Sequence, residues 1–498
     1  MPIIPAERFD LLVIGGGITG CGVARDAAMR GLKVALVERD DFGSGTSGRS
    51  SRLVHGGIRY LEHGQLHLVR ESIHEREILL RIAPHLVKPL AFTWPVYRGA
   101  RIGKWKLSAG LFVYQLLAGR KSHPYASLSA AETLEREPSL AGTGLTGGAV
   151  YHDARTDDAR LTVANAVAAE ENGAFVVTHT RVTGILREGR RAIGATVESR
   201  HGGESAEIRA RCVVSAIGVW PNVFASPGSK QSTRGSKGVH IAVPRERVDN
   251  RAAVALISPI DGRVMFCLPA ETQTIIGTTD TWTDEHPESV RSSVADVDYL
   301  LRSANEYFPR AGLTRDDVVS AWAGIRPLAS PQSGNPSAAS REHSIVSDES
   351  GIITVTGGKL TTYRAMAAEI VDRVEQALGR KTRRAATDSA ELPGADRDSE
   401  IAAMEKSDPK LSVQLVEGLP YTGAHLVYGV MREKARTLSD LLIRRTHIAF
   451  EAQDHGKGVA RAAATIVAPL LDWDEKLLST RIQEFEQDVG RMFSISAR

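Results

Sequence analysis

A glycine-rich segment near the start of the chain, residues 15–20, limits the fold more strongly than any other part of the sequence. The short apolar run before it, residues 10–14, has the composition of a buried strand. The alanine-rich residues 20–30 predict a helix, and residues 33–37 predict a second strand. The segment itself reads G-x-G-x-x-G, so the sequence predicts a strand–turn–helix–strand unit that begins a parallel sheet.

Each glycine of this pattern has a physical reason. Gly15 allows a tight turn, Gly17 lets the backbone approach a pyrophosphate, and Gly20 lets the helix pack closely on the strand. The helix N-terminus offers free N–H groups and a partial positive charge to the phosphates. Glu38 closes the second strand, where a carboxylate can accept hydrogen bonds from a ribose. The unit therefore predicts a dinucleotide site that favours NAD or FAD over NADP.

Later segments indicate FAD rather than NAD. Residues 40–51 form a loop dense in hydroxyls that can surround a second part of a cofactor, although a flexible surface linker is the alternative. A strand at 212–215 runs into Gly218, and a strand at 352–355 runs into a Gly-Gly turn and a helix. Such a turn is a second anion site, which in a flavoprotein can stabilise the charge of the reduced ring. Contacts spread this widely along the chain suit the long FAD molecule.

Composition narrows the classes of function. The 498 residues suffice for roughly three domains. A net charge of +3 argues against nucleic acid as a partner. Cys21, Cys212 and Cys267 lie far apart, so we expect no disulfide framework and no metal site, in a reducing cytosol. We expect neither a signal peptide nor a membrane-spanning helix, because no long apolar run occurs. Peripheral attachment to a membrane stays open.

Several longer motifs follow one another along nearly the whole chain, with a gap around 380–410. They are SSRLVHGGIRYLEHGQ (50–65), EREILLRIAPHLV (75–87), YHDARTDDARL (151–161), IIGTTDT (275–281), AGIRPL (323–328), TGGKLTTYR (356–364) and ARTLSDLLIRRTHIAF (435–450). Together they resemble the aerobic, quinone-linked, FAD-dependent glycerol-3-phosphate dehydrogenase family. Several long motifs in the family's order are far more specific than a single fingerprint.

The resemblance implies an α/β fold with a doubly wound FAD-binding domain of the glutathione-reductase-like Rossmann type, a β-sheet substrate domain and a C-terminal helical domain. It implies oxidation of sn-glycerol 3-phosphate to dihydroxyacetone phosphate, with electrons passed to a membrane quinone. The protein would then be cytoplasmic and peripherally associated with the cytoplasmic face of the inner membrane; a homodimer is a further expectation. We place the FAD-binding domain at 1–85, 150–235 and 320–380, the substrate domain at 86–149 and 236–319, a linker at 381–410, and the helical domain at 411–498.

Cofactor contacts are expected at the first glycine turn, the ribose acid, the hydroxyl loop and the two later glycine turns. The predicted FAD-binding residues are Gly15, Gly17, Gly20, Glu38, Thr46, Ser47, Ser51, Leu53, Gly218, Gly358, Lys359, Leu360 and Thr361.

The implied reaction removes a hydride from C2 of the substrate and a proton from its hydroxyl, while the phosphate must be held. Arginine binds a phosphate dianion with planar bidentate donors. The candidate substrate-binding residues are Arg59, Tyr60, Arg326, Arg341, Lys359 and Thr361. Arg341 rests on a shorter match than Arg59 and Arg326. For each arginine the alternative is a solvated charge or a structural ion pair.

The predicted catalytic residues are His55, Arg59, His240, Arg326 and Lys359. His55 and His240 are the candidate bases because histidine titrates near neutral pH. The alternative for either is a buried, hydrogen-bonded histidine in a turn. Asp280 either orients a donor or caps a turn, and the turn is favoured.

Three places depart from the family pattern. Residues 216–220 read AIGVW where the family usually has ATGPW, and Val239 replaces a serine beside His240. Contact between residues 216–220 and a flavin is expected through the backbone, so binding should survive. Residues 395–412 look shortened and are expected to lack a helix.

A basic amphipathic helix is a further prediction. Ile102, Trp105, Ala109, Phe112, Val113 and Leu116 fall on one helical face, flanked by Arg98, Arg101, Lys104, Lys106, Arg120 and Lys121. Such a helix either lies in a membrane interface or packs on its own domain.

Other functions were weighed against this one. A glycerol-3-phosphate oxidase that uses oxygen is the nearest, but the family's oxidases tend to carry an insertion that is not seen here. A tRNA-binding flavoprotein would need a strongly basic face. A non-catalytic flavin-binding relative is kept open by the altered residues 216–220.

Overall fold

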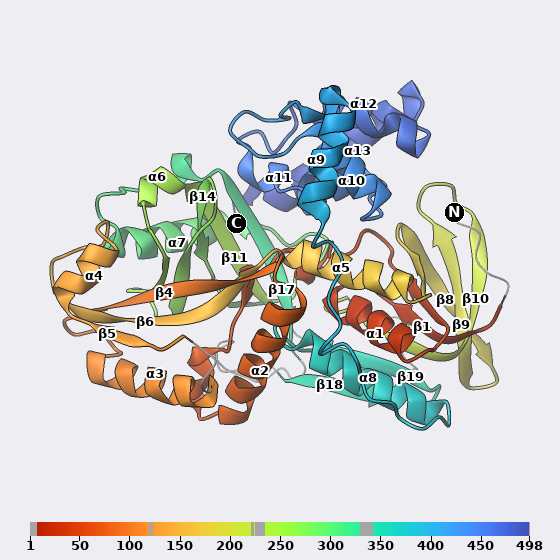
Figure 1. The fold of residues 1–498 in the computed structure, drawn as a ribbon, viewed down its shortest axis with the longest axis horizontal. Coiled ribbons are helices and arrows are strands. Elements are labelled where there is room, and N and C mark those ends of the chain that lie inside the picture. Colours follow the sequence, from red (N-terminus) through yellow and green to blue (C-terminus); the bar gives the residue numbers. More distant parts are fainter. Residues whose placement is uncertain (1–6, 119–122, 221–223, 225–234, 329–341, 498) are drawn as a thin grey trace.

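The computed structural model describes residues 7–118, 123–220, 224, 235–328 and 342–497. They form two β-sheets, and the helices of the C-terminal part lie across the top of both in Figure 1. The predicted combination of an FAD-type α/β domain, a second sheet and a C-terminal helical domain is confirmed.

The first sheet contains the predicted strand–turn–helix–strand unit. The register pairs Ile14 of its central strand with Val37 on one side and Ser215 on the other, both in parallel. The carboxyl ends of these strands therefore meet at one edge, where open α/β sheets bind ligands. In spatial order the strands are β18 (His343–Ser347), β19 (Ile352–Gly357), β10 (Ser205–Ser215), β1 (Phe9–Ile14), β2 (Val34–Val37) and β7 (Phe175–Val177), with β8 (Thr180–Glu188) and β9 (Arg191–Ser199) joined through β10.

Alternate residues of β1 face two different cores, as the period of a strand requires. Leu11 and Val13 pack in a core with three helices, α1 (Ile18–Met29), α5 (Asp158–Glu171) and α8 (Tyr363–Ala377). Leu12 and Ile14 pack on the other face against β8 and β9. Burial on both faces explains why this strand is apolar throughout.

The second sheet is mostly antiparallel and lies to the left of the first in Figure 1. Its strands are β15 (Thr281–Thr283), β11 (Gly235–Pro244), β14 (Gln273–Gly277), β13 (Val264–Pro269), β12 (Ala253–Ile257), β4 (Val87–Tyr97), β6 (Leu145–Thr156) and β3 (Leu53–Val54), with β17 (Ser320–Pro327) on β11 and β5 (Ala126–Leu128) on β6. The helices around it are α2 (Leu66–Ile82), α3 (Lys104–Ala118), α4 (Ala130–Arg136), α6 (Arg245–Val248) and α7 (Val294–Tyr307), and short 3-10 turns are η1 (Thr46–Gly48), η2 (Ile58–His63) and η3 (Arg315–Asp317).

Two segments belong to a different sheet from the one predicted. β17 pairs with β11, so residues 320–327 lie in the second sheet and not in the FAD-binding segment expected at 320–380. β3 likewise pairs with β6. A strand of apolar and small residues suits either sheet, and only long-range pairing decides between them. The remaining domain boundaries stay predictions.

The C-terminal part is helical, as predicted. It comprises α9 (Arg397–Ser407), η5 (Pro409–Ser412), α10 (Gly423–Met431), the π-helix η6 (Asp440–Arg445), α11 (Ile448–Glu451), α12 (Ala460–Leu471) and α13 (Glu475–Phe493), and ends in β20 (Ile495–Ser496), which pairs with β16 (Ser292–Ser293). The prediction that residues 395–412 lack a helix, within a linker at 381–410, was wrong because α9 forms there. Its Ile401 is buried among largely exposed polar residues, so the helix has almost no apolar pattern to detect.

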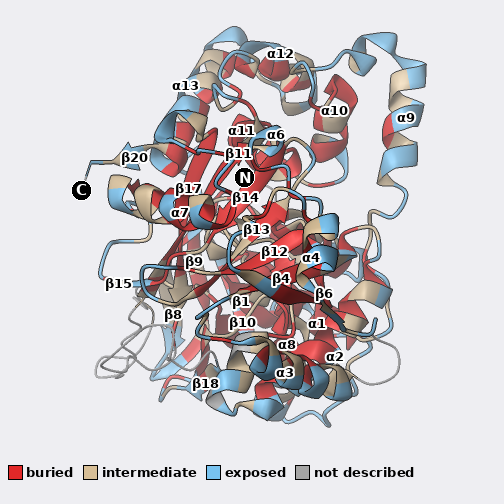
Figure 2. Cartoon of the chain, turned by 90° about the vertical axis from the view of Figure 1, so that its left-hand side faces the viewer, coloured by how far each residue is buried: buried red, intermediate tan, exposed pale blue. Residues whose placement is uncertain are grey.

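The predicted amphipathic helix exists as α3, although Ile102 precedes it and is buried. Gly103 separates Ile102 from the helix, which begins at Lys104. The helix lies at the surface of the molecule (Figure 2). No helix among the residues described is long and apolar enough to cross a membrane.

Candidate functional site

A cavity of 690 Å³ lies at the carboxyl ends of β1, β10 and β19 and extends to the second sheet. Both sheets contribute to its wall, so the cavity is suited to a cofactor on the first sheet and a substrate beside the second. The predicted site residues that line it are Gly15, Gly17, Glu38, Thr46, Ser47, Ser51, Leu53, His55, Tyr60, Gly218, His240, Arg326, Gly358, Lys359, Leu360 and Thr361. Gly20 lies behind the turn, while the side chain of Arg59 and all of Arg341 fall outside the described part of the chain.

The first glycine turn cannot carry side chains at two of its positions. Gly15 has φ +105°, and a Cβ there would lie 2.7 Å from the carbonyl oxygen of Ala216. A Cβ at Gly20 would lie 1.9 Å from the carbonyl oxygen of Gly15. These contacts agree with the predicted roles of a tight turn and close helix packing. The N-terminus of α1 therefore reaches the cavity with its backbone exposed to a ligand.

Glu38 sits under this turn and lines the cavity. Its carboxylate accepts hydrogen bonds from the backbone N–H of Gly16 at 2.5 Å and of Asp40 at 2.8 Å. Burial raises the pKa of Glu38 to about 6. Residues 180–183 of β8 also line the cavity near this end. Sequence reasoning missed them because a short edge of an irregular strand carries no motif.

Hydroxyls of the loop at 40–51 fix the loop as well as facing the cavity. Thr46 Oγ1 donates to the carbonyl of Ile325 at 2.7 Å, and Ser47 Oγ accepts from the N–H of Ile18 at 3.0 Å. The loop is therefore tied to both sheets, unlike a flexible linker.

The turn at 356–361 meets the turn at 55–57 across the cavity. Thr361 Oγ1 accepts from the N–H of His55 at 3.1 Å and lies 3.3 Å from its carbonyl oxygen. Lys359 Nζ lies 4.0 Å from the ring centroid of Tyr60, within cation–π distance, and 3.5 Å from Ser72 Oγ. The structure thus brings together His55, Tyr60, Lys359 and Thr361, as the sequence predicted.

His240 faces the same cavity from β11. Its Nε2 lies 2.7 Å from Ser51 Oγ, and its ring stacks on Trp322 with centroids 5.4 Å apart. The Nδ1 atom is buried with no hydrogen-bond partner among the described residues. Burial, and then the cations of Arg326 and Arg52, lower the pKa of His240 to about 3. The imidazole is therefore neutral near pH 7 and can accept a proton from a bound molecule.

The guanidinium of Arg326 is held by the segment at 278–280. It donates to Thr278 Oγ1 at 2.9 Å, to the carbonyl of Thr279 at 3.3 Å and to Asp280 Oδ1 at 3.2 Å. Asp280 is buried and therefore orients a donor, which the sequence left as the less favoured of its two roles. A Cβ at Gly238 would lie 2.2 Å from Arg326 Nη2, so this glycine makes room for the arginine.

Asp153 is a site residue that the sequence did not single out, although it lies inside the quoted YHDAR motif. Its Oδ1 accepts from the N–H of Gly56 at 3.0 Å, from Arg76 Nη1 at 2.6 Å and from Tyr114 OH at 2.7 Å. It lines the cavity and joins the turn at 55–57 to α2 and α3. The convergence of three segments is a property of the fold, and only the motif hinted at it.

Comparisons with known proteins agree with this geometry. Residues 10–373 match the family described as FAD dependent oxidoreductase, and residues 394–477 match the C-terminal domain of alpha-glycerophosphate oxidase. Glycerol-3-phosphate dehydrogenase 2 of Mycobacterium tuberculosis (strain ATCC 25618 / H37Rv) is 39% identical over 94% of this chain and 86% of its own. The chain belongs to the FAD-dependent glycerol-3-phosphate dehydrogenase family.

Other relatives support the family. The aerobic glycerol-3-phosphate dehydrogenase of Staphylococcus saprophyticus is 40% identical over 78% of this chain and 72% of its own. The structure of the Bacillus halodurans glycerol-3-phosphate dehydrogenase, complexed with FAD, has a TM-score of 0.79 and 31% identity, and the match covers 98% of this chain and 95% of that one.

FAD, the cofactor of this glycerol-3-phosphate dehydrogenase family, fits the residues present. The backbone at Gly15 and Gly17 is open to a pyrophosphate, and Glu38 lines the cavity where a ribose is expected. The glycine turns at 218 and 358 line its other part, both with positive φ. FAD supplies the hydride acceptor when bound. The individual cofactor contacts stay predictions.

Proposed function

We propose that this protein oxidises sn-glycerol 3-phosphate to dihydroxyacetone phosphate, with FAD as the hydride acceptor and a membrane quinone as the final acceptor. The names of its relatives point to this substrate. The observation that carries the proposal is a single cavity that places the held guanidinium of Arg326 near the neutral imidazole of His240. A phosphorylated secondary alcohol needs both an anion site and a proton acceptor.

Arg326 binds the phosphate in this proposal, with Lys359, Tyr60 and the predicted Arg59 and Arg341 as its partners. Arginine suits a phosphate dianion because its planar donors match two oxygen atoms. The fixed position of Arg326 reduces the entropy that binding would otherwise cost.

His240 accepts the hydroxyl proton in the same proposal. Its pKa of about 3 would make it a weak base, but part of that lowering comes from Arg326. A phosphate dianion bound to Arg326 offsets this cation and raises the pKa of His240 toward the range of a useful base. His55 is the alternative base, from the turn at 55–57.

Anaerobic reduction of the bound flavin tests the substrate assignment. The FAD-loaded protein should lose its absorbance near the flavin band on mixing with sn-glycerol 3-phosphate and keep it with glycerol. Arg326→Ala should slow this reduction about 100-fold or more, because a buried charged contact is worth a few kcal/mol. Arg315→Ala, which removes an exposed ion pair with Asp298, is the matched control. A wild-type protein that holds FAD and is not reduced would exclude this substrate.

Helix α3 supports the proposal of a peripheral protein on the cytoplasmic face of the inner membrane. Its outer side chains Trp105, Phe112 and Leu116 are 91%, 58% and 71% exposed, while Leu107 and Leu111 pack inward. Lys106 and Arg101 are charged residues beside this face. Exposed large apolar side chains with flanking cations suit an interface with anionic lipids.

Vesicle binding tests this second part. The protein should sediment with vesicles that contain anionic lipid, and the variant with Trp105, Phe112 and Leu116 changed to serine should stay in the supernatant while its flavin is still reduced. Val413→Ser, on an exposed apolar residue of the C-terminal part, is the control. Unchanged sedimentation of the triple variant would contradict the proposal. Hydrogen peroxide formed in step with substrate would favour the oxidase alternative, and sedimentation velocity would test the expected homodimer.

A further inference from the structure

The loop at 38–52, named here the FAD loop, carries Glu38 at its start and the hydroxyls that line the cavity. The segment at 433–447 of the helical domain, named here the clamp segment, contacts this loop at both ends. We infer that the clamp segment positions the FAD loop for the cofactor, so that the helical domain acts in FAD binding without reaching the cavity itself.

The first end of the FAD loop is held through Asp41, which is completely buried. Arg445 Nη1 and Nη2 donate to its two carboxylate oxygens at 2.7 and 2.8 Å, and Arg444 Nε donates at 2.5 Å. Arg445 is equally buried, and its other donors reach the carbonyl of Glu433 at 2.7 and 3.0 Å. A bidentate pair fixes both distance and orientation, which a single contact does not.

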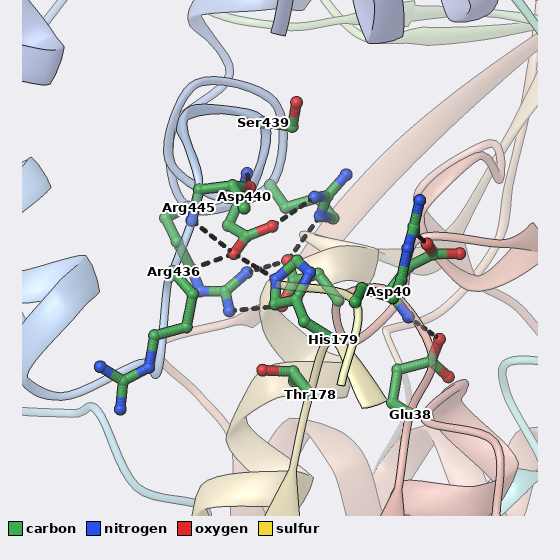
Figure 3. Close-up of polar contacts among 12 residues, drawn as sticks. Glu38, Asp40, Thr178, His179, Arg436, Ser439, Asp440 and Arg445 are labelled. Carbon is green, nitrogen blue, oxygen red and sulfur yellow. Dashed lines mark hydrogen bonds and ion pairs between the residues drawn. The ribbon is translucent and has the colours of Figure 1, made fainter. Parts of the chain in front are cut away.

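A second path reaches the same end through His179 (Figure 3). Asp440 Oδ2 lies 2.9 Å from His179 Nε2 and accepts from the backbone N–H of Arg436 at 2.8 Å. The backbone N–H of His179 donates to the carbonyl of Asp40 at 2.7 Å. The next residue donates to the carbonyl of Glu38 at 2.9 Å. The clamp segment therefore reaches the ribose acid through a short chain of hydrogen bonds.

The far end of the FAD loop is held through Arg52. Its Nη1 lies 3.2 Å from His447 Nδ1, and its guanidinium lies 4.6 Å from the ring centroid of Phe450. His447 Nε2 in turn lies 3.2 Å from Asp157. The residue before Arg52 is Ser51, which bonds to His240 in the cavity. The clamp segment thus fixes both ends of the FAD loop.

Simple docking of one domain on another would not require this arrangement. Burying full charges is costly, and the cost is offset only where the geometry is specific. The same segment also makes ion pairs that avoid the FAD loop, such as Lys434 with Glu170 at 2.5 Å on α5. Lys434 therefore offers a control that weakens docking and leaves the loop contacts in place.

FAD affinity of the protein stripped of its flavin, measured by the loss of flavin fluorescence on titration, tests the clamp. Arg444→Met should raise the FAD Kd about tenfold or more, because one buried charged contact to Asp41 is lost. Arg444→Lys should recover part of this loss by restoring the cation. Lys434→Met should change the Kd by less than about twofold, as expected for a partly exposed pair. Equal losses in Arg444→Met and Lys434→Met, or no loss in either, would overturn the inference.

A second pair of variants decides the outcome if Arg444→Met does not fold. His447→Gln can accept from Arg52 through Oε1 and donate to Asp157 through Nε2, whereas His447→Leu can do neither. His447→Leu should weaken FAD binding several-fold and His447→Gln should restore it, with similar unfolding midpoints for the two flavin-free proteins. Identical FAD affinity for the leucine and glutamine variants would overturn the inference. No substrate is present in these titrations, so the result does not depend on the proposed substrate.

Discussion

Three oxygen atoms of consecutive residues hold the guanidinium of Arg326: the hydroxyl of Thr278, the carbonyl of Thr279 and the carboxylate of Asp280. This side chain is therefore set in place before any ligand arrives. Asp280 is the charged member of the three and is buried, so it contributes most to the orientation.

Asp280→Asn should raise the KM for glycerol 3-phosphate about tenfold and change kcat less, because a charge-assisted hydrogen bond worth about 1.5–3 kcal/mol is weakened. Steady-state kinetics with an artificial acceptor measure both constants. Asp298→Asn, at an exposed pair with Arg315, is the control. A KM equal to that of the wild type would contradict the role given to Asp280.

Single residues differ in how far the sequence revealed them. The histidine at 240, the arginine at 326 and the lysine at 359 were predicted from motifs, and the structure brings all three to one cavity. Asp153 was not predicted, because its partners come from residues 56, 76 and 114 and no local pattern connects them. Local chemistry can be seen in a sequence, whereas a meeting of distant segments depends on the fold.

At the level of elements, the turn at 55–57 is tied to α3 by contacts that leave no spare room. A Cβ at Gly56 would lie 2.2 Å from Tyr114 OH and 2.6 Å from Ile73 Cγ1. The same hydroxyl donates to Asp153, which in turn accepts from the N–H of Gly56. The helix with the exposed apolar face is therefore packed directly against a turn of the cavity.

Gly56→Ala should lower the free energy of unfolding by about 1–3 kcal/mol, as overpacking in a dense site does. In the Tyr114→Phe background the same change should cost less, because the nearest clashing atom is gone, although Ile73 still limits the space. Urea unfolding of the four proteins in this double-mutant cycle measures the difference. Additive effects would mean that the turn moves away from α3 instead of pressing on it.

Elements also differ in how far they could be predicted. The first strand, helix and second strand followed from apolar periodicity and the glycine turn, and the structure has them at 9–14, 18–29 and 34–37. α9 was missed because only Ile401 among its side chains is buried. The sheet to which β17 belongs was missed because its apolar pattern is the same in either place. Period and turn chemistry are local, while sheet membership is not.

On the scale of the whole molecule, charged contacts between the helical domain and the first sheet are largely buried and include one titratable histidine. His179 pairs with Asp440, stacks on His201 with centroids 4.8 Å apart, and lies near Asp41, Arg444 and Glu38. Burial lowers the pKa of His179, but Asp440 outweighs it, and the net pKa is raised above its usual 6.5. The same pairing, with Arg444 and Arg445, lowers the pKa of Asp440 well below its usual value.

The pH dependence of stability follows from these directions. A raised pKa for His179 gives stabilisation that is complete below about pH 6.5 and is lost as the pH rises through the higher folded value. The lowered pKa of Asp440 gives stabilisation that is present above about pH 4 and lost in stronger acid. The unfolding temperature of wild type relative to His179→Gln should therefore be highest between these limits and fall toward pH 9. A difference that does not vary with pH would show that His179 stays neutral throughout.

The position of the clamp segment along the chain has a consequence for synthesis. Domains generally fold as units while the chain is still being made, starting from the N-terminus. The strands and glycine turns of the first sheet are complete once residue 357 has emerged, but the partners of Asp41 and Arg52 lie at 444, 445 and 447. Stable flavin loading therefore belongs to the last stage of translation, and a ribosome that stops short of residue 440 releases a chain with every cavity-lining segment and a loop still unready for its cofactor.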